Sequence, residues 1–92
     1  MPPTESYGDL PSPSFEILVA QIATPALVQL GQIPNPINGK TEISLPRSRF
    51  SIELLRILAD RTRGNLKPEE ERALRAVLAQ LQTRYAELSA QG

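Results

Sequence analysis

The sequence predicts a small all-α domain of three helices, with a kinked first helix, an ordered Pro/Gly connector and a disordered N-terminal tail. Three observations predict this fold: apolar residues recur at spacings of three and four in three segments, Ser or Pro precedes or opens each segment, and Gly follows the first two. We expect helices at about 15–30, with a break near 25, at 46–63 and at 68–88. Together they form a single helical domain over 14–89.

Residues 1–13 are expected to be a disordered tail. Four prolines lie there among small polar and acidic residues, and only Tyr7 and Leu10 are large and apolar. So little apolar surface cannot offset the entropy cost of ordering the chain. Ser14 then stands where an N-cap belongs, directly before the first apolar run.

The first helix is expected to be apolar on every side, because its polar side chains are few and scattered around the axis: Glu16, Gln21, Thr24 and Gln29. Such a helix must be covered on all sides by other protein or by lipid. Pro25 has no amide proton and its ring clashes with the carbonyl of the residue four positions earlier, which predicts a kink or a break. Gly31 provides the C-terminal stop.

The connector of residues 32–44 contains the tight-turn pair Asn38-Gly39. This pair could close a short hairpin between Ile37 and Ile43, but the prolines before it restrict any strand to a sheet edge, so a packed turn is favoured.

The second helix is expected to open near Ser44 or Leu45, with Pro46 in its first turn. Its apolar arc is wider than one helix can cover: Phe50, Ile52, Leu54, Leu55, Ile57, Leu58 and Ala59. The third helix starts at Pro68, followed by acidic residues that suit a helix N-terminus. Its seam packs along another helix and consists of Leu74, Leu78, Leu81, Tyr85 and Leu88.

The composition excludes several kinds of chemistry. The chain has no cysteine and no histidine, so the common zinc and haem sites and the histidine-dependent nucleophile systems are excluded. We therefore expect no cofactor, no metal site and no catalytic residue. The apolar run of residues 15–30 would rise only about 24 Å as a helix, less than a bilayer core of about 30 Å, so we expect a cytoplasmic protein without a membrane span.

Several short motifs resemble one known family. They are the run from Ala26 to Pro36, the run from Thr62 to Leu66, the acidic triplet Glu69 to Glu71, and Arg84-Tyr85. In this order they are similar to a bacterial family named domain of unknown function 1844, over about residues 15–88. The resemblance implies a small all-helical bacterial protein with no assigned activity, cofactor or catalytic residue.

The surplus of apolar surface predicts a non-enzymatic protein that associates with itself, with a dimer favoured, or with an unidentified protein. The candidate interface consists of Phe15, Leu18, Val19, Ile22, Leu27, Ile52 and Leu55.

Two alternatives remain open. One is a regulatory or nucleic-acid-associated protein that uses a basic face within residues 47–67, formed by Arg47, Arg49, Arg61 and Arg63. Zero net charge and the lack of an exposed aromatic platform disfavour it. The other is a small-molecule-binding protein or enzyme with a pocket near Pro25.

Overall fold

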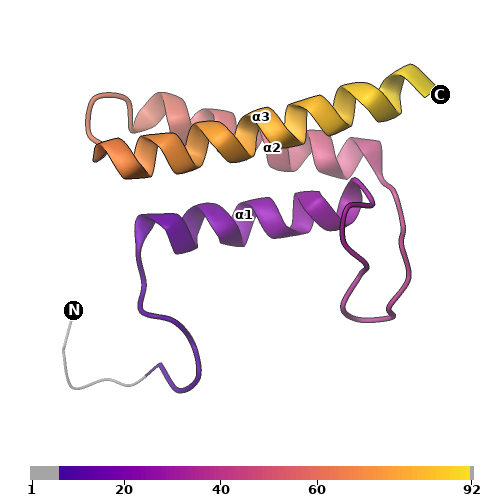
Figure 1. Cartoon of the computed structure of the whole chain (residues 1–92), viewed down its shortest axis with the longest axis horizontal. Helices are drawn as coiled ribbons and strands as arrows, with labels where there is room; N and C mark the ends of the chain where they lie inside the picture. Colours follow the sequence, from indigo (N-terminus) through magenta and orange to yellow (C-terminus); the bar gives the residue numbers. More distant parts are fainter. Residues whose placement is uncertain (1–6, 92) are drawn as a thin grey trace.

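The computed structural model describes residues 7–91 and consists of three helices (Figure 1). These are α1 (Phe15–Gln29), α2 (Leu45–Arg61) and α3 (Pro68–Gln91). Within the described range there is no strand, and one isolated antiparallel bridge joins Leu30 and Ile43. The predicted all-α fold with three helices is therefore confirmed.

The helices alternate in direction along the chain. Figure 1 shows α2 running back against α1, while α3 returns in the direction of α1 and lies in front of α2. All three helices contribute to one core, which also includes the residue after α1: Val19, Ala23, Ala26, Leu30, Ile52, Leu55, Leu74 and Leu81. The predicted seam of α3 lies on this core, with Leu78, Tyr85 and Leu88 half-buried around it.

Small side chains lie on the buried faces of α1 and α2. Ala26 and Ser48 are fully buried, and Ser51 is nearly so. Ser48 satisfies its hydroxyl within α2 by donating to the carbonyl of Leu45 at 2.8 Å. Ser51 donates to Oε1 of Gln29 at 3.3 Å and so ties α2 to the end of α1. Side chains of this size allow two helix backbones to approach closely.

Each helix starts with a side chain that satisfies a free backbone amide. The Ser14 hydroxyl accepts from the amide of Ile17 at 3.1 Å, as the sequence predicted, and the Ser44 hydroxyl accepts from the amide of Arg47 at 3.4 Å. At α3 the carboxylate of Glu70 accepts from the amide of Lys67 at 2.9 Å. These contacts set the first residue of each helix.

Replacement of Ser14 with alanine should lower the free energy of unfolding by about 1 kcal/mol, because the first turn of α1 loses its cap. Urea denaturation followed by circular dichroism measures the change. Ser12→Ala, in the exposed segment before the helix, is the matched control and should have no effect. Equal stability of the two variants would contradict the capping role.

The break expected near residue 25 is absent, since α1 runs unbroken through Pro25. Pro25 and Gln21 are both exposed. The carbonyl of Gln21, which the proline deprives of its donor, is therefore on a side of α1 that solvent can reach, and this lowers the cost of the lost hydrogen bond. The bend itself stays a prediction.

The connector leaves the end of α1 and returns to the same point. The amide of Ser44 donates to the carbonyl of Gln29 at 2.8 Å, next to the Leu30–Ile43 bridge. Gly31 has a φ of +74°, and a Cβ there would lie 3.1 Å from Cγ1 of Ile43, so glycine suits both the turn and the close approach.

At the tip of the connector Ile37 is 91% exposed, so the optional hairpin between Ile37 and Ile43 is not formed. Asn35 and Asn38 instead order the tip, because their side chains accept from the amides of Ile37 and Lys40, each at 2.9 Å.

The expected disordered tail lies partly outside the described residues. Residues 1–6 are not described. Residues 7–13 form no helix, and all but Tyr7 are exposed. One turn closes there, with the amide of Leu10 donating to the carbonyl of Tyr7 at 3.1 Å.

Candidate functional site

Three exposed large apolar side chains lie in one row on α2. Phe50 is 66% exposed, Leu54 39% and Ile57 57%. Their spacing of four and three residues places them on the same face of the helix. We call these three residues the α2 stripe. The opposite face of α2 carries Ser48, Leu55 and the other core residues, so α1 and α3 leave the stripe uncovered.

The structure separates the seven residues of the candidate interface into two groups. Leu18 is 48% exposed, and Phe15, Ile22 and Leu27 are half-buried against the core. The other three lie in the core itself: Val19, Ile52 and Leu55. Those three are not available as an outer surface, because packing of α1, α2 and α3 against one another already buries them.

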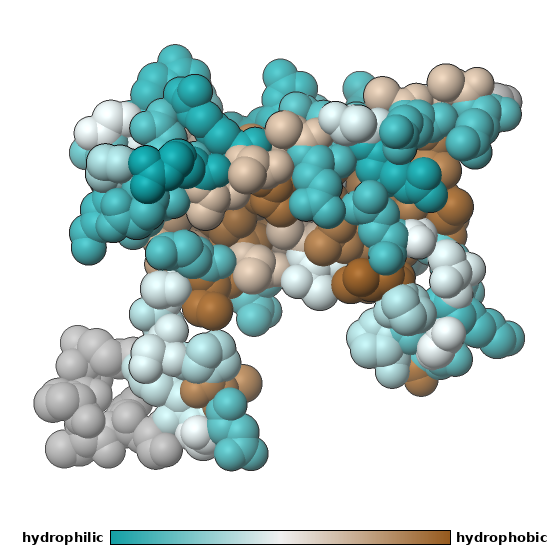
Figure 2. Space-filling model, in the orientation of Figure 1, coloured by the Kyte–Doolittle hydropathy of each residue, from teal (hydrophilic) through white to brown (hydrophobic). Residues whose placement is uncertain are grey.

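The expectation that α1 has no face for water is corrected by the burial pattern. Only Val19, Ala23 and Ala26 are fully covered within the helix, whereas Gln21, Thr24, Pro25 and the apolar Leu18 and Ala20 are exposed. Figure 2 shows apolar side chains along α1 and below α3, while polar side chains occupy much of the upper edge. One side of α1 is thus open to solvent.

The antiparallel register of α1 and α2 shows where the exposed residues of α1 lie along α2. The hydrogen bond between Ser51 and Gln29 fixes the antiparallel register of the two helices. At an equal rise per residue, this register places Ile22 level with Leu58, and Leu18 one turn further along, near Arg61. Leu18 is therefore an exposed apolar residue level with the C-terminal end of α2, beyond Ile57.

The four arginines of the candidate basic face do not converge. Arg47 and Arg49 lie in the first turns of α2, whereas Arg61 is its last residue and Arg63 follows it. Arg47 and Arg61 are about 21 Å apart along the helix, at a rise of about 1.5 Å per residue. A single phosphate cannot contact both ends.

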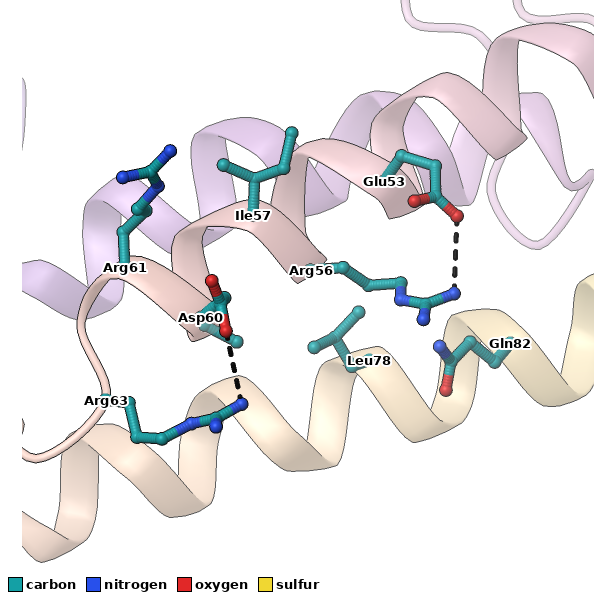
Figure 3. A pocket seen from close by; sticks show the side chains of 9 residues that line it. Glu53, Arg56, Ile57, Asp60, Arg61, Arg63, Leu78 and Gln82 are labelled. Carbon is teal, nitrogen blue, oxygen red and sulfur yellow. Dashed lines mark hydrogen bonds and ion pairs between the residues drawn. The ribbon is translucent and has the colours of Figure 1, made fainter.

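An open groove of about 610 Å³ lies between α2 and α3 (Figure 3). Its polar walls contain two ion pairs of α2 and the turn after it: Arg56 with Glu53 and Arg63 with Asp60, both at 3.3 Å. Arg56 and Arg63 extend toward α3, whereas Ile57 and Arg61 point away from it. Arg56 and Arg63 are paired with carboxylates, whereas Arg61, which also lines the groove, forms no ion pair within residues 7–91. Three arginines and two carboxylates leave the groove with a small positive charge.

A row of alternating charges lies beside the α2 stripe. It consists of Arg49, Glu53, Arg56 and Asp60, and we call it the charged row. The spacings of four, three and four keep the row on one side of the helix. It borders α3, because Arg49, Glu53 and Arg56 line a hollow together with Gln82 and Tyr85.

The described residues present no group of three or more acidic side chains placed to hold a metal ion. Four hollows formed by the described residues are lined by residues other than Pro25 and Gln21, so these four do not support the alternative pocket near Pro25. In the part of the chain from residue 7 to residue 91, no helix has both the length and the apolar character to cross a membrane.

A family model described as "Domain of unknown function (DUF1844)" matches residues 12–87, which include all of α1 and α2 and most of α3. No curated protein and no solved structure matches the chain.

Proposed function

Because the chain belongs to the family described as a domain of unknown function (DUF1844), whose name gives no activity, we propose a function from its surface: a non-enzymatic module that associates with a second copy of itself. The contact is made by the α2 stripe. A cytoplasmic, bacterial setting is part of the proposal.

The exposure of the α2 stripe is the observation that carries this proposal. Phe50 and Ile57 leave more than half of their side-chain surface open although a core has formed on the opposite side of the same helix. Burial of such side chains releases about 25 cal/mol for each Å² of apolar area removed from water. A continuous exposed apolar patch typically marks an interaction site.

A second copy suits this surface better than an unidentified partner for a geometric reason. A twofold axis at the stripe covers the same patch on both chains at once, so one apolar row supplies both halves of the interface. The groove beside the stripe is lined by three arginines and two carboxylates, so its charge is close to balanced and does not favour a strongly acidic or strongly basic partner.

The double variant Phe50→Asp/Ile57→Asp should shift the protein to monomer, because association would then bury carboxylates in an apolar contact. Sedimentation velocity over a range of concentrations measures the assembly state. Ala76→Asp, at an exposed position on α3, is the control and should associate like the parent chain. A parent chain that stays monomeric at high micromolar concentration would overturn the proposal.

A further inference from the structure

We propose that the two copies meet through α2 in antiparallel orientation, about a twofold axis near Leu54. This inference rests on the proposed self-association and adds its orientation and its residue pairs. It is carried by two features of the outer face of α2: an apolar row that is nearly symmetric about its centre, and a charged row whose signs are complementary when it is reversed.

The apolar row fits an antiparallel pair. A twofold axis perpendicular to the helix near Leu54 reverses the order of residues, so positions whose distances from the centre agree to within one residue, about 1.5 Å, face each other. Leu54 then contacts its own copy, and Phe50 faces Ile57 of the second copy. These are the three large apolar side chains that α1 and α3 leave exposed. The whole α2 stripe is covered by this arrangement.

The charged row favours the antiparallel orientation of the two α2 helices. Read along the helix, Arg49, Glu53, Arg56 and Asp60 carry the signs plus, minus, plus and minus. In an antiparallel pair the same edge of each helix meets the other, and the reversed row reads minus, plus, minus, plus. Arg49 then faces Asp60 of the second copy, and Glu53 faces Arg56. Each of the two pairs occurs twice, so four oppositely charged contacts form.

The ion pairs that the charged row makes within one chain do not prevent these contacts. Arg49 has no ion-pair partner among residues 7–91, so Asp60 of the second copy gives it one. Glu53, Arg56 and Asp60 already form pairs three residues apart, but their side chains are more than half exposed and each carboxylate can accept from a second arginine.

The other edge of α2 is less favourable, because the same axis places Arg47 opposite Arg61 of the second copy. Each of these positions is about 10 Å from the axis along the helix, at the solvent-exposed rim. At physiological salt, the repulsion between these exposed arginines weakens over a distance of about 8 Å. A parallel pair would instead bring the charged row against this arginine edge, with Arg49 close to Arg47, and would lose the four attractive contacts.

Two reversed variants test the charge pairing. Arg49→Glu/Arg56→Glu makes the whole row acidic, and Glu53→Arg/Asp60→Arg makes it basic. Each variant alone should associate at least about tenfold more weakly than the parent chain. An equimolar mixture should form a heterodimer with an affinity near that of the parent, measured by native mass spectrometry and sedimentation. Circular dichroism of each variant checks that the helices are retained.

Cysteine crosslinking tests the orientation, since the chain has no cysteine of its own. Leu54→Cys should form a disulfide with its own copy. Phe50→Cys alone should not, because its two copies are about 12 Å apart along an antiparallel pair, beyond the Cα separation of about 7 Å that a disulfide spans. A mixture of Phe50→Cys and Ile57→Cys should give the mixed crosslink.

The outcomes separate this inference from the proposed function. If the parent chain is a monomer, both are overturned. If the parent associates and Phe50→Asp/Ile57→Asp abolishes association, the proposed function is supported. In that case two results would still overturn the antiparallel pairing: reversed variants that associate as tightly as the parent, or efficient crosslinking of Phe50→Cys to itself.

Discussion

Replacement of Leu55 with alanine should lower the free energy of unfolding by about 2–5 kcal/mol. Leu55 is fully buried and belongs to the core to which all three helices contribute. Removal of its isobutyl group leaves a cavity that the surrounding side chains fill only in part. In a chain of this size the expected loss is a large share of a total stability of about 5–15 kcal/mol.

The neighbouring Leu54 provides a matched control for this effect. Leu54→Ala removes the same atoms one residue away, on the exposed side of α2, and should cost less than about 1 kcal/mol when the protein is dilute enough to be monomeric. Urea denaturation of both variants at the same low concentration makes the comparison. Equal losses of unfolding free energy at the two positions would contradict the burial of Leu55 and the exposure of Leu54.

The helices and their limits could be predicted from local chemistry. Ser14 and Pro68 mark the starts of α1 and α3 because a hydroxyl cap and a residue without an amide proton suit those positions wherever the helix packs. The seam of α3 was predictable for a related reason: its leucines follow a single narrow stripe. Local signals of this kind do not depend on the partner of the helix.

The buried side of α2 could not be predicted in the same way. Its apolar residues spread over an arc that includes both Leu55 and Phe50, so periodicity alone does not say which side faces α1. The structure buries the side with Ser48 and Ser51, because these small residues allow α1 to approach. The larger Phe50 is left outside. Side-chain size at the helix contact, together with the burial of Ile52 and Leu55, therefore accounts for the face that is covered.

The same reason explains the errors in the candidate interface. The predicted interface includes Ile52 and Leu55, because one partner helix cannot cover the full arc of α2, whereas the structure buries both residues in the core. That argument correctly implies an uncovered remainder, but its position depends on the register between α1 and α2. The register is fixed by long-range contacts such as the Ser51–Gln29 hydrogen bond, which the sequence does not reveal.

Replacement of Ala26 with leucine should also destabilise the fold, for the opposite reason. Ala26 is fully buried on α1, in the same core cluster as Leu30 and Leu55. Leucine has three more carbon atoms than alanine. Because Ala26 is fully buried, these atoms must push α1 away from its neighbours. Overpacking of this kind typically costs about 1–3 kcal/mol and sometimes more.

Ala20→Leu is the control for Ala26→Leu, because Ala20 is an exposed alanine of the same helix. Its added side chain extends into solvent and should change the free energy of unfolding by no more than about 0.5 kcal/mol. Urea denaturation at a low, monomeric concentration measures both variants. If Ala26→Leu is tolerated as well as Ala20→Leu, α1 and its neighbours are not in close contact at this position. Close packing of small residues would then not be the reason that α2 presents Phe50, Leu54 and Ile57 to solvent.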